Sequence, residues 1–286
     1  MTLKLCGPAL ISHDGVLEKV TNLLVMTITR KHPCQQDLGE EDDLDDLEET
    51  SEYDWLVIDT ALDAIIGLAV ALGPAFGQLY KIFEKPIMRF ASSSDSTERS
   101  TAVGVIAECI RGMGSAITPY TSVLLKLLLH RLSDEDTETK SNAAFAVGLL
   151  LEQSTHDQEI LKSFNIILSK LEPLLHTQEA RALDNAAGCV SRMITKHRNR
   201  VPIAEVLPAL VALLPLKQDF EENEPVYNMI ISLCKPLSLT PRSPQQQCSS
   251  LTHLLPQIPR RNPSSSVSRR SWCPSSRKCS ARPRSS

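Results

Sequence analysis

Apolar residues recur along the middle of this chain at intervals of three and four residues. The stretch "STAVGVIAECIRGM" shows this spacing at Ala102, Val105, Ile106, Cys109 and Ile110. Residues spaced in this way lie on one face of an α-helix. The pattern therefore predicts a helix over 100–113 with one buried stripe and one polar face.

The same pattern occurs in several copies. The segments "DTALDAIIGLAVAL", "STAVGVIAECIRGM", "SNAAFAVGLLLEQS" and "DNAAGCVSRMITKH" each begin with Ser or Asp, continue with Thr or Asn, and carry Ala third. They begin at positions 59, 100, 141 and 184, so the intervals are 41, 41 and 43 residues. A weaker fifth copy begins near Glu224. Self-similarity at such a period is typical of repeat proteins.

A second set of apolar segments alternates with the first. It comprises "FGQLYKIFEKPIMRFA", "YTSVLLKLLLHRL", "ILKSFNIILSKLEPLL" and "IAEVLPALVALLPL", followed by polar turns at 92–96, 133–136, 176–178 and 217–219. Pairs of antiparallel helices cannot bury their apolar stripes alone, so each pair must stack on the next. A period near 41 fits HEAT or armadillo repeats, and two helices per unit favour HEAT. The predicted fold is all-α, an α-α superhelix (HEAT/armadillo-like solenoid) of about five to six helical hairpins in residues 1–240.

Composition agrees with an all-α protein. Aromatic residues make up only 4% of the 286 residues, and glycine is scarce. The longest apolar run, 65–72, is shorter than the roughly 18 residues that a membrane span needs, and the N-terminus lacks the pattern of a signal peptide. We therefore expect an intracellular chain that does not enter a membrane. Cys109, Cys189 and Cys234 are expected on apolar helix faces, and no cysteine has metal-ligand spacing, so no metal or cofactor is expected.

Charge is strongly segregated along the chain. Residues 37–54, "DLGEEDDLDDLEETSEYD", contain eleven carboxylates and no Lys or Arg. We expect an acidic interhelical loop here, followed by a helix beginning near Trp55, because such a tract repels itself and cannot be buried. Its field would attract polycations, although a loop that is merely solvated is the alternative. The candidate residues for binding a basic partner are Glu40, Glu41, Asp42, Asp43, Asp45, Asp46, Glu48 and Glu49.

Two further sets of residues are candidates for contacts. Asp134 precedes Lys140 by six residues, a spacing at which a turn carboxylate and a basic residue can form a ladder between adjacent repeats. The alternative is that Asp134 only caps the following helix. Ser93 with Arg99 is a partial match. The remaining candidates lie off the apolar stripe of second helices, which line the inner surface of such a fold, and are Glu108, Arg111, Glu152 and Arg192.

No sequence pattern supports catalysis. The chain has no phosphate loop, no GxSxG and no HExxH, and its histidines are scattered. We therefore do not expect an enzyme.

The last segment, 241–286, differs from the rest. It contains eight Arg, one Lys, seven Pro, thirteen Ser and no acid. We expect this basic tail to be disordered. It is interpreted either as the product of a frameshift, a retained intron or a faulty gene model, or as a basic arm that contacts nucleic acid or the acidic loop.

At the level of whole segments, the chain resembles the importin-β family of karyopherins. Residues 57–155, "DNAAGCVSRMI" and "VPIAEVLPALVALLPLKQDFEENEPVY" carry the resemblance, which covers roughly 17–237 and is to the C-terminal part of fungal members above all. The resemblance implies HEAT repeats, basic cargo proteins such as ribosomal proteins and histones, and release by Ran GTPase. The family's main Ran-binding surface and nucleoporin-binding grooves lie largely upstream. We therefore expect a fragment that does not complete an import cycle alone.

Two functions follow from these observations. The first is a nuclear transport receptor fragment that binds basic cargo and shuttles between cytoplasm and nucleus. The second is a HEAT-repeat scaffold that organises a phosphatase or chromatin complex without carrying cargo.

Overall fold

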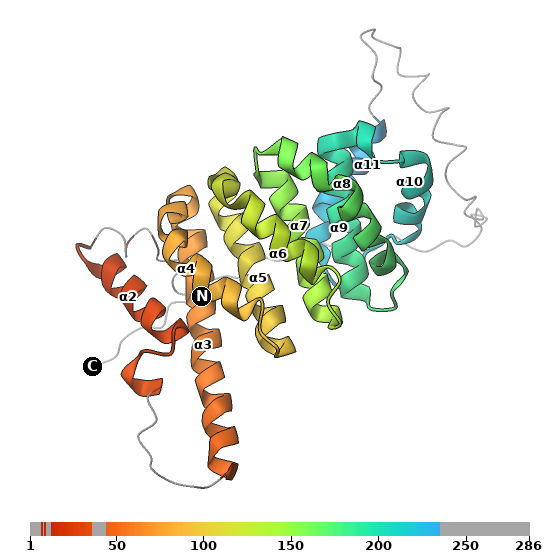
Figure 1. Ribbon diagram of the computed structural model, residues 1–286. Coiled ribbons are helices and arrows are strands. Elements are labelled where there is room, and N and C mark those ends of the chain that lie inside the picture. Colours follow the sequence, from red (N-terminus) through yellow and green to blue (C-terminus); the bar gives the residue numbers. More distant parts are fainter. Residues whose placement is uncertain (1–6, 8, 10–12, 36–43, 235–286) are drawn as a thin grey trace, which may run out of the picture. The chain divides into compact units, whose positions relative to one another are not determined.

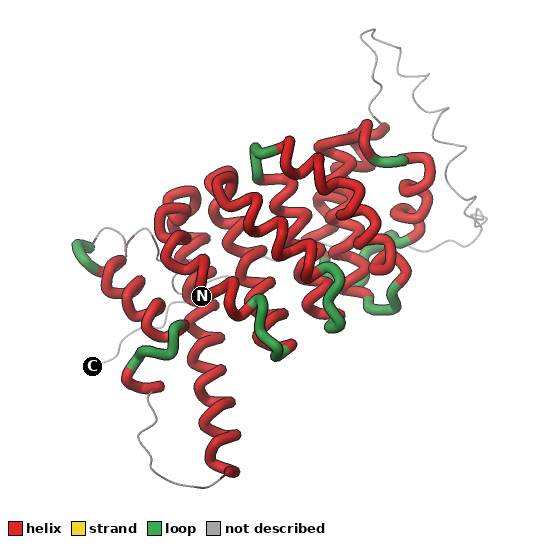
Figure 2. The backbone as a smooth tube through the Cα atoms, viewed as in Figure 1, coloured by secondary structure: helices red, strands yellow, loops and turns green. Residues whose placement is uncertain are grey.

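The computed structural model describes residues 7, 9, 13–35 and 44–234, with side chains from Asp54 onward in the second range. The described residues form α-helices joined by short turns and 3₁₀ segments, with no strand among them (Figure 2). They belong to one unit of packed helices. The expected tail at 241–286 lies outside the described residues.

The helices follow one another as hairpins (Figure 1). Each hairpin has a first helix and a second helix. The pairs are α2 (Val16–Ile28) with α3 (Leu44–Leu72), α4 (Phe76–Phe90) with α5 (Ser96–Met113), α6 (Thr121–Arg131) with α7 (Thr137–Gln153), α8 (Asp157–Leu171) with α9 (Ala180–His197), and α10 (Ile203–Ala212) with α11 (Asn223–Cys234). Short 3₁₀ segments join them, at Pro33–Gln35, Gly73–Ala75, Gly114–Tyr120, Glu172–His176, Arg198–Arg200 and Phe220–Glu222.

The second helices pack against one another in a row. Helix α3 packs on α5, α5 on α7, α7 on α9, and α9 on α11. Helices in the middle of the row are therefore covered on both sides, and α7 and α9 are buried over most of their length. The first helices cover one side of this row (Figure 1). The structure confirms the predicted all-α solenoid of helical hairpins.

Local signals fix where the helices begin and end. The carboxylate of Asp95 accepts a hydrogen bond from the Glu98 amide at 2.9 Å and caps α5, and Asp136 caps α7 through the Thr139 amide at 2.7 Å. These bonds satisfy amides that would otherwise lack a partner. Helices α3 and α5 are followed by Gly73 and Gly114, with φ of 56° and 55°, a left-handed conformation that favours glycine.

Helix α3 begins earlier than the sequence suggested. We expected a loop up to Asp54, whereas the helix begins at Leu44. Acidic residues in the first turns of a helix are stabilised by the positive end of its dipole, so a run of carboxylates is compatible with a helical N-terminus. Of the acidic candidates, Asp45, Asp46, Glu48 and Glu49 therefore lie in α3. Glu40, Glu41, Asp42 and Asp43 lie outside the described residues.

Within the described residues, the segment Asp54–Phe90 is long and apolar enough to cross a membrane. The sequence-based expectation counted uninterrupted apolar residues and did not find it. The segment is broken by the 3₁₀ turn Gly73–Ala75, and its largest apolar side chains pack into the solenoid. Fully buried examples are Ile58, Leu62, Ile65, Tyr80 and Phe83. Length and composition alone do not distinguish such core helices from a membrane span.

The core is one continuous cluster along the row of second helices. Each fully buried Leu, Ile or Phe contributes about 1.5–3 kcal/mol relative to an exposed one. Cys109 and Cys189 are buried in this cluster, as expected, whereas Cys234, expected on an apolar helix face, is exposed at the end of α11.

Buried ion pairs join adjacent hairpins. The Arg99 guanidinium donates to Asp134 at 2.9 Å, and both side chains are almost inaccessible. Arg131 donates to the same carboxylate at 2.6 Å. Asp134 therefore connects α5 to the turn before α7. Its partner across the repeats is Arg99, not Lys140, and the cap of α7 is Asp136.

Two asparagines form a second set of contacts between second helices. Asn142 Nδ2 donates to the Ser100 carbonyl oxygen at 2.9 Å, and Asn185 Nδ2 donates to the Ser141 hydroxyl at 3.0 Å. These residues occupy the first two positions of the repeated sequence motif. In these copies the Ser and Asn of the motif therefore link adjacent second helices.

The buried carboxylate of Asp134 gives a test of the ladder. Substitution of Asp134 by Asn should lower the free energy of unfolding by about 3 kcal/mol, because it leaves the buried Arg99 charge without its buried counterion. The matched control is Glu135→Gln, since Glu135 also contacts Arg99 but its side chain is 89% exposed. The control should change stability by less than about 1 kcal/mol. Urea unfolding measures both, and equal effects would contradict the ladder.

The same residue predicts a pH dependence. Burial by itself raises the pKa of Asp134, but hydrogen bonds from Arg99 and the Asp136 amide outweigh it and lower the pKa. The charged carboxylate therefore stabilises the fold above its unfolded pKa of about 3.9, and this contribution is lost as pH falls through the folded value. The stability difference between wild type and Asp134→Asn should be full at pH 6 and shrink below about pH 4. A difference that stays constant over this range in urea titrations would refute the assignment.

Candidate functional site

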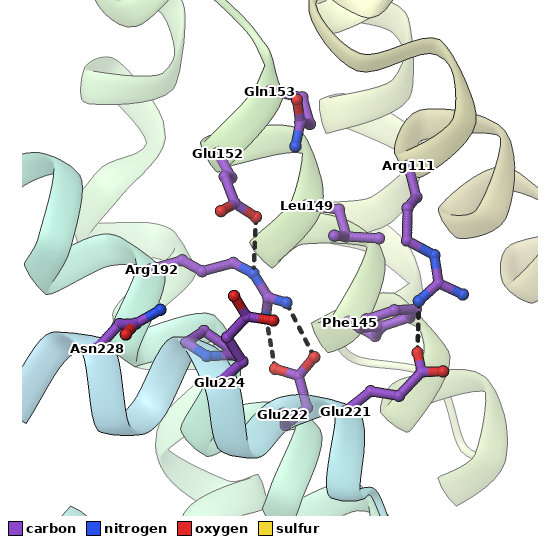
Figure 3. Close-up of a pocket in the computed structure, with 11 residues that line it drawn as sticks. Arg111, Phe145, Leu149, Glu152, Gln153, Arg192, Glu221, Glu222, Glu224 and Asn228 are labelled. Atoms are coloured by element: carbon purple, nitrogen blue, oxygen red, sulfur yellow. Dashed lines mark hydrogen bonds and ion pairs between the residues drawn. The ribbon is translucent and has the colours of Figure 1, made fainter. Parts of the chain in front are cut away.

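A hollow of about 360 Å³ lies on the face formed by the second helices (Figure 3). Helices α5, α7, α9 and α11 and the 3₁₀ turn Phe220–Glu222 contribute its lining. The lining residues are Arg111, Phe145, Leu149, Glu152, Gln153, Arg192, Glu221, Glu222, Glu224, Pro225 and Asn228. We call this hollow the second-helix pocket.

A buried ion pair forms one wall of the pocket. Arg192 binds Glu222 through both terminal nitrogens, at 2.5 and 3.0 Å, and its Nε donates to Glu152 at 3.1 Å. The Glu222 side chain is completely buried and that of Arg192 is 8% exposed. A bidentate pair of this kind fixes geometry as well as charge. It attaches the turn before α11 to α9 and, through Glu152, to α7.

Two glycines make room for this pair. A Cβ atom at Gly188 would lie 1.3 Å from Glu222 Oε2, and one at Gly148 would lie 3.1 Å from the Cα atom of Cys189. Both glycines sit inside helices, where glycine is normally unfavourable by about 0.5–1 kcal/mol relative to alanine. Their presence is explained by the close approach of Glu222 and of α9.

Phe145 lies between two guanidinium groups. The Cζ atom of Arg111 is 5.7 Å from the ring centroid and that of Arg192 is 5.9 Å from it. Arg111 is held by Glu108 of its own helix and by Glu221, which lies in a hairpin that is not adjacent along the row. The contact with Glu221 links α5 to the turn before α11 across α7 and α9 (Figure 3).

The turn that carries Glu221 and Glu222 is anchored by Asp184 of α9. One carboxylate oxygen of the fully buried Asp184 accepts hydrogen bonds from the backbone amides of Lys217, Gln218 and Asp219, at 3.0, 2.7 and 3.0 Å. Three amides converging on one oxygen leave the turn little freedom. The two glutamates are thus presented to the pocket by a rigid segment.

Burial shapes the electrostatics of the pocket. Burial raises the pKa of Glu222, and the hydrogen bonds from Arg192 oppose this without cancelling it. Burial likewise raises the pKa of Asp219. The Cys189 thiol beneath Arg192 has its pKa raised by burial to about 12, so at neutral pH it stays protonated and is a poor nucleophile.

The structure brings together the four second-helix candidates. Arg111, Glu152 and Arg192 line the pocket, and Glu108 holds Arg111. Most of these side chains are therefore engaged in ion pairs that span hairpins. Sequence reasoning missed their partners, Glu221 and Glu222, and the ring of Phe145. The two adjacent acids in "QDFEENEP" are visible in the sequence. No sequence spacing, however, connects Glu221 to Arg111 or Glu222 to Arg192, which lie some thirty to a hundred residues earlier.

Lys140 is placed away from this pocket. Its side chain has no hydrogen-bond or ion-pair partner in the described part of the chain. It lines a separate hollow of about 360 Å³ with Asp134 and Lys170. The candidate residues in the acidic tract remain untested, because their side chains are not described.

The pocket is suited to binding charged groups. Its carboxylates, Glu152, Glu221, Glu222 and Glu224, outnumber the guanidiniums of Arg111 and Arg192. Glu224 has no ion-pair partner among the described residues, and Glu152 is half exposed. Among the residues that the structure describes, no group of His, Cys, Asp and Glu could hold a metal ion.

These features define a class of protein: a helical-repeat solenoid with a charged pocket on the face of its second helices. Two of the solved structures that it resembles are designed armadillo repeat proteins. One, in complex with the peptide (KR)4, is 17% identical with a TM-score of 0.47 and covers 81% of this chain and 99% of its own. Another is 15% identical with a TM-score of 0.48 and covers 80% and 87%.

Sequence comparison identifies the family. The model for "Importin subunit beta-1-like, TPR repeats" matches residues 44–150. The probable importin subunit beta-4 of Schizosaccharomyces pombe is 40% identical over 224 residues, which are 75% of this chain and 21% of that protein. Importin-4 of Homo sapiens is 35% identical over 224 residues, 77% of this chain and 20% of that protein. The chain therefore belongs to the importin-β family, and it spans about a fifth of the length of these curated relatives.

Gly188 gives a test of the pocket geometry. Substitution by Ala should lower the melting temperature by several degrees, because its Cβ collides with Glu222 and displaces the buried pair. The control is Gly104→Ala in α5, where a Cβ would meet its nearest neighbour, Asn142 Nδ2, at an ordinary 3.5 Å. That substitution should leave stability unchanged or raise it by up to about 1 kcal/mol. Similar behaviour of the two variants in thermal unfolding would disprove the packing described.

Proposed function

We propose that this chain is a cargo-binding part of an importin-β-type nuclear transport receptor. It binds basic segments of proteins that are imported into the nucleus. Membership of the importin-β family is the observation that carries the proposal. The charges of the chain suggest where binding occurs.

Two regions supply negative charge for a basic partner. The first is the acidic tract, whose eight central carboxylates lie between Glu40 and Glu49. Such a tract speeds encounter with a polycation and makes affinity sensitive to salt. The second is the second-helix pocket, where Glu152 and Glu224 have free acceptor capacity. A Lys or Arg side chain entering the pocket would find carboxylates that Arg111 and Arg192 do not fully satisfy.

Partners and localisation follow from the same proposal. By family resemblance the cargo comprises basic proteins such as ribosomal proteins and histones, and the receptor shuttles between cytoplasm and nucleus. Ran GTPase and nucleoporins are expected partners of the longer relatives, and the proposal does not require this chain to contact them.

A salt-titrated pull-down with a basic nuclear-localisation peptide tests the acidic tract. The variant replaces Glu40, Glu41, Asp42, Asp43, Asp45, Asp46, Glu48 and Glu49 by the corresponding amides. Binding at 50 mM salt should weaken at least tenfold, and the salt dependence should flatten, because the attracting charge is gone. A second variant, Glu152→Gln/Glu224→Gln, tests the pocket and should weaken binding several-fold.

The basic tail requires its own control. Residues 241–286 carry nine Lys and Arg and would compete with the peptide for the same carboxylates. Deletion of 241–286 should therefore leave binding unchanged or strengthen it. Equal binding by wild type and both amide variants, with and without the tail, would exclude cargo recognition at these sites and favour a scaffold that carries no cargo.

A further inference from the structure

The turns before α5, α7 and α9 share one hydrogen bond. In each turn a side-chain oxygen accepts from the backbone amide of the N-cap residue two positions later. The three bonds are Asp95 to Ser93 Oγ at 3.2 Å, Asp136 to Asp134 Oδ1 at 3.1 Å, and Glu179 to Thr177 Oγ1 at 3.3 Å. Ser93, Asp134 and Thr177 therefore occupy the same position in three consecutive hairpins.

Thr177 takes the place of the buried carboxylate of the preceding turn. It follows Asp134 by 43 residues, the interval between the motif copies at 141 and 184. Lys140 follows Arg99 by 41 residues, the interval between the copies at 100 and 141. Since Arg99 pairs with Asp134 across adjacent hairpins, the same register relates Lys140 to Thr177. The rung of the ladder between α7 and α9 thus has a cation but no carboxylate.

The turn before α5 offers no such pairing. The residue related to Ser93 by the same register is Ile58 of α3, which is fully buried and uncharged. Of the three related turns, the one before α9 is therefore the one that combines a hydroxyl with an unpaired cation.

Lys140 and Thr177 line the same hollow of about 360 Å³. Lys170 of α8 also lines it and donates to the Ser133 hydroxyl. Lys140 is half-buried and has no hydrogen-bond or ion-pair partner in the part of the chain that the structure describes. Two ammonium groups thus converge on a space beside the Thr177 hydroxyl.

The acidic groups around the hollow do not neutralise these lysines. Asp134, the carboxylate in its lining, already binds two guanidiniums. Glu138 in the first turn of α7 pairs with Arg181. Glu172 and Glu179 are exposed and do not line the hollow. The hollow therefore has room and positive charge for one further anionic group.

We propose that Thr177 is a phosphorylation site whose phosphate binds Lys140 and Lys170 and so completes the ladder between α7 and α9. A protein kinase transfers the terminal phosphoryl group of ATP to this residue. The Thr177 hydroxyl oxygen bonds to the γ-phosphorus, the bond to ADP breaks, and the hydroxyl proton passes to a base of the kinase. The neighbouring His176 and Gln178 are exposed, so the turn is accessible to such an enzyme.

A phosphate suits this position for two reasons. It carries a charge of about −1.5 to −2 at pH 7 and three acceptor oxygens, so it can bind both ammonium groups. It also lies just before the N-terminus of α9, a helix of 18 residues, whose dipole favours negative charge. Because Thr177 supplies only a hydroxyl before modification, this rung is open in the unmodified chain and closed in the phosphorylated one. Phosphorylation therefore stiffens the junction between two hairpins.

Thermal unfolding of the full chain with phosphothreonine incorporated at position 177 tests the contact. The phosphorylated chain should melt about 3 °C or more above the unmodified one. In Lys140→Gln/Lys170→Gln, phosphothreonine should give no such gain over the unmodified form of the same variant. The matched control is Lys162→Gln, an exposed lysine of α8 outside the hollow, which should keep the whole gain. Absence of a gain, or a gain that survives in the double variant, would overturn the proposal.

Thr177→Asp tests the register without a kinase. It restores the carboxylate of the neighbouring rung and should raise the melting temperature by about 1–2 °C. In the Lys140→Gln background it should have almost no effect, because the two residues are coupled. Equal effects in both backgrounds would contradict the pairing of Lys140 with position 177.

Two further measurements decide whether the anion is a modification. Mass spectrometry of the chain isolated from cells with phosphatase inhibitors should find phosphothreonine at position 177, and recovery of that peptide in unmodified form alone would refute the assignment. Millimolar inorganic phosphate, compared with chloride at equal ionic strength, should hardly change the melting temperature of the unmodified chain. A rise that Lys140→Gln abolishes would replace the modification by a site for a free anion. None of these readouts involves cargo, so the inference is tested independently of the function proposed above.

Discussion

The structure depends on the contact between successive second helices. Each helix in the middle of the row is covered on both sides, so small residues such as Ala143, Ala144 and Gly148 are needed where backbones approach. This constraint explains the repeated small-residue motif. It also explains why most polar groups in the row are paired, since an unpaired one between two helices would have no access to water. Asn142 and the pair of Arg192 with Glu222 satisfy this requirement, whereas Asn185 and Arg99 satisfy it in part, because Asn185 Oδ1 and Arg99 Nε are buried without a partner among the described residues.

The sequence predicted the parts of the fold that depend on local periodicity. Hairpins, their period and their turns could be read because each unit repeats the same local pattern. Helix starts were less accurate, since the polar first turns of α3, α5 and α7 carry no apolar stripe. Both residues of the observed rung were identified, Asp134 as the turn carboxylate and Arg99 as the basic residue of a partial match. Their pairing with each other was not predicted, because Arg99 comes from the preceding unit and no spacing within one unit relates the two.

The pocket was predicted only in part for the same reason. Arg111, Glu152 and Arg192 were recognisable because they lie off the apolar stripe of predicted helices. Glu221 and Glu222 belong to a turn whose position is set by Asp184 from another hairpin. Their role depends on the packing of this turn against helices that are distant in sequence. Gly188 is likewise explained only by the structure, in which Glu222 packs directly against it. Binding surfaces of a solenoid are thus harder to read from sequence than its scaffold.

The link between Arg111 and Glu221 has a mechanical consequence. Units in a solenoid usually contact only their nearest neighbours, so such proteins bend along their length and unfold locally from their ends. Here the turn inside the last described hairpin, just before α11, is tied to α9 and also to α5. Loss of that turn would release ties to two other hairpins at once. Glu221 is mostly exposed, so its tie to Arg111 contributes about 0–1 kcal/mol, and a ligand that displaces Glu221 would release α5 from the last described hairpin while leaving the buried pair of Arg192 and Glu222 in place.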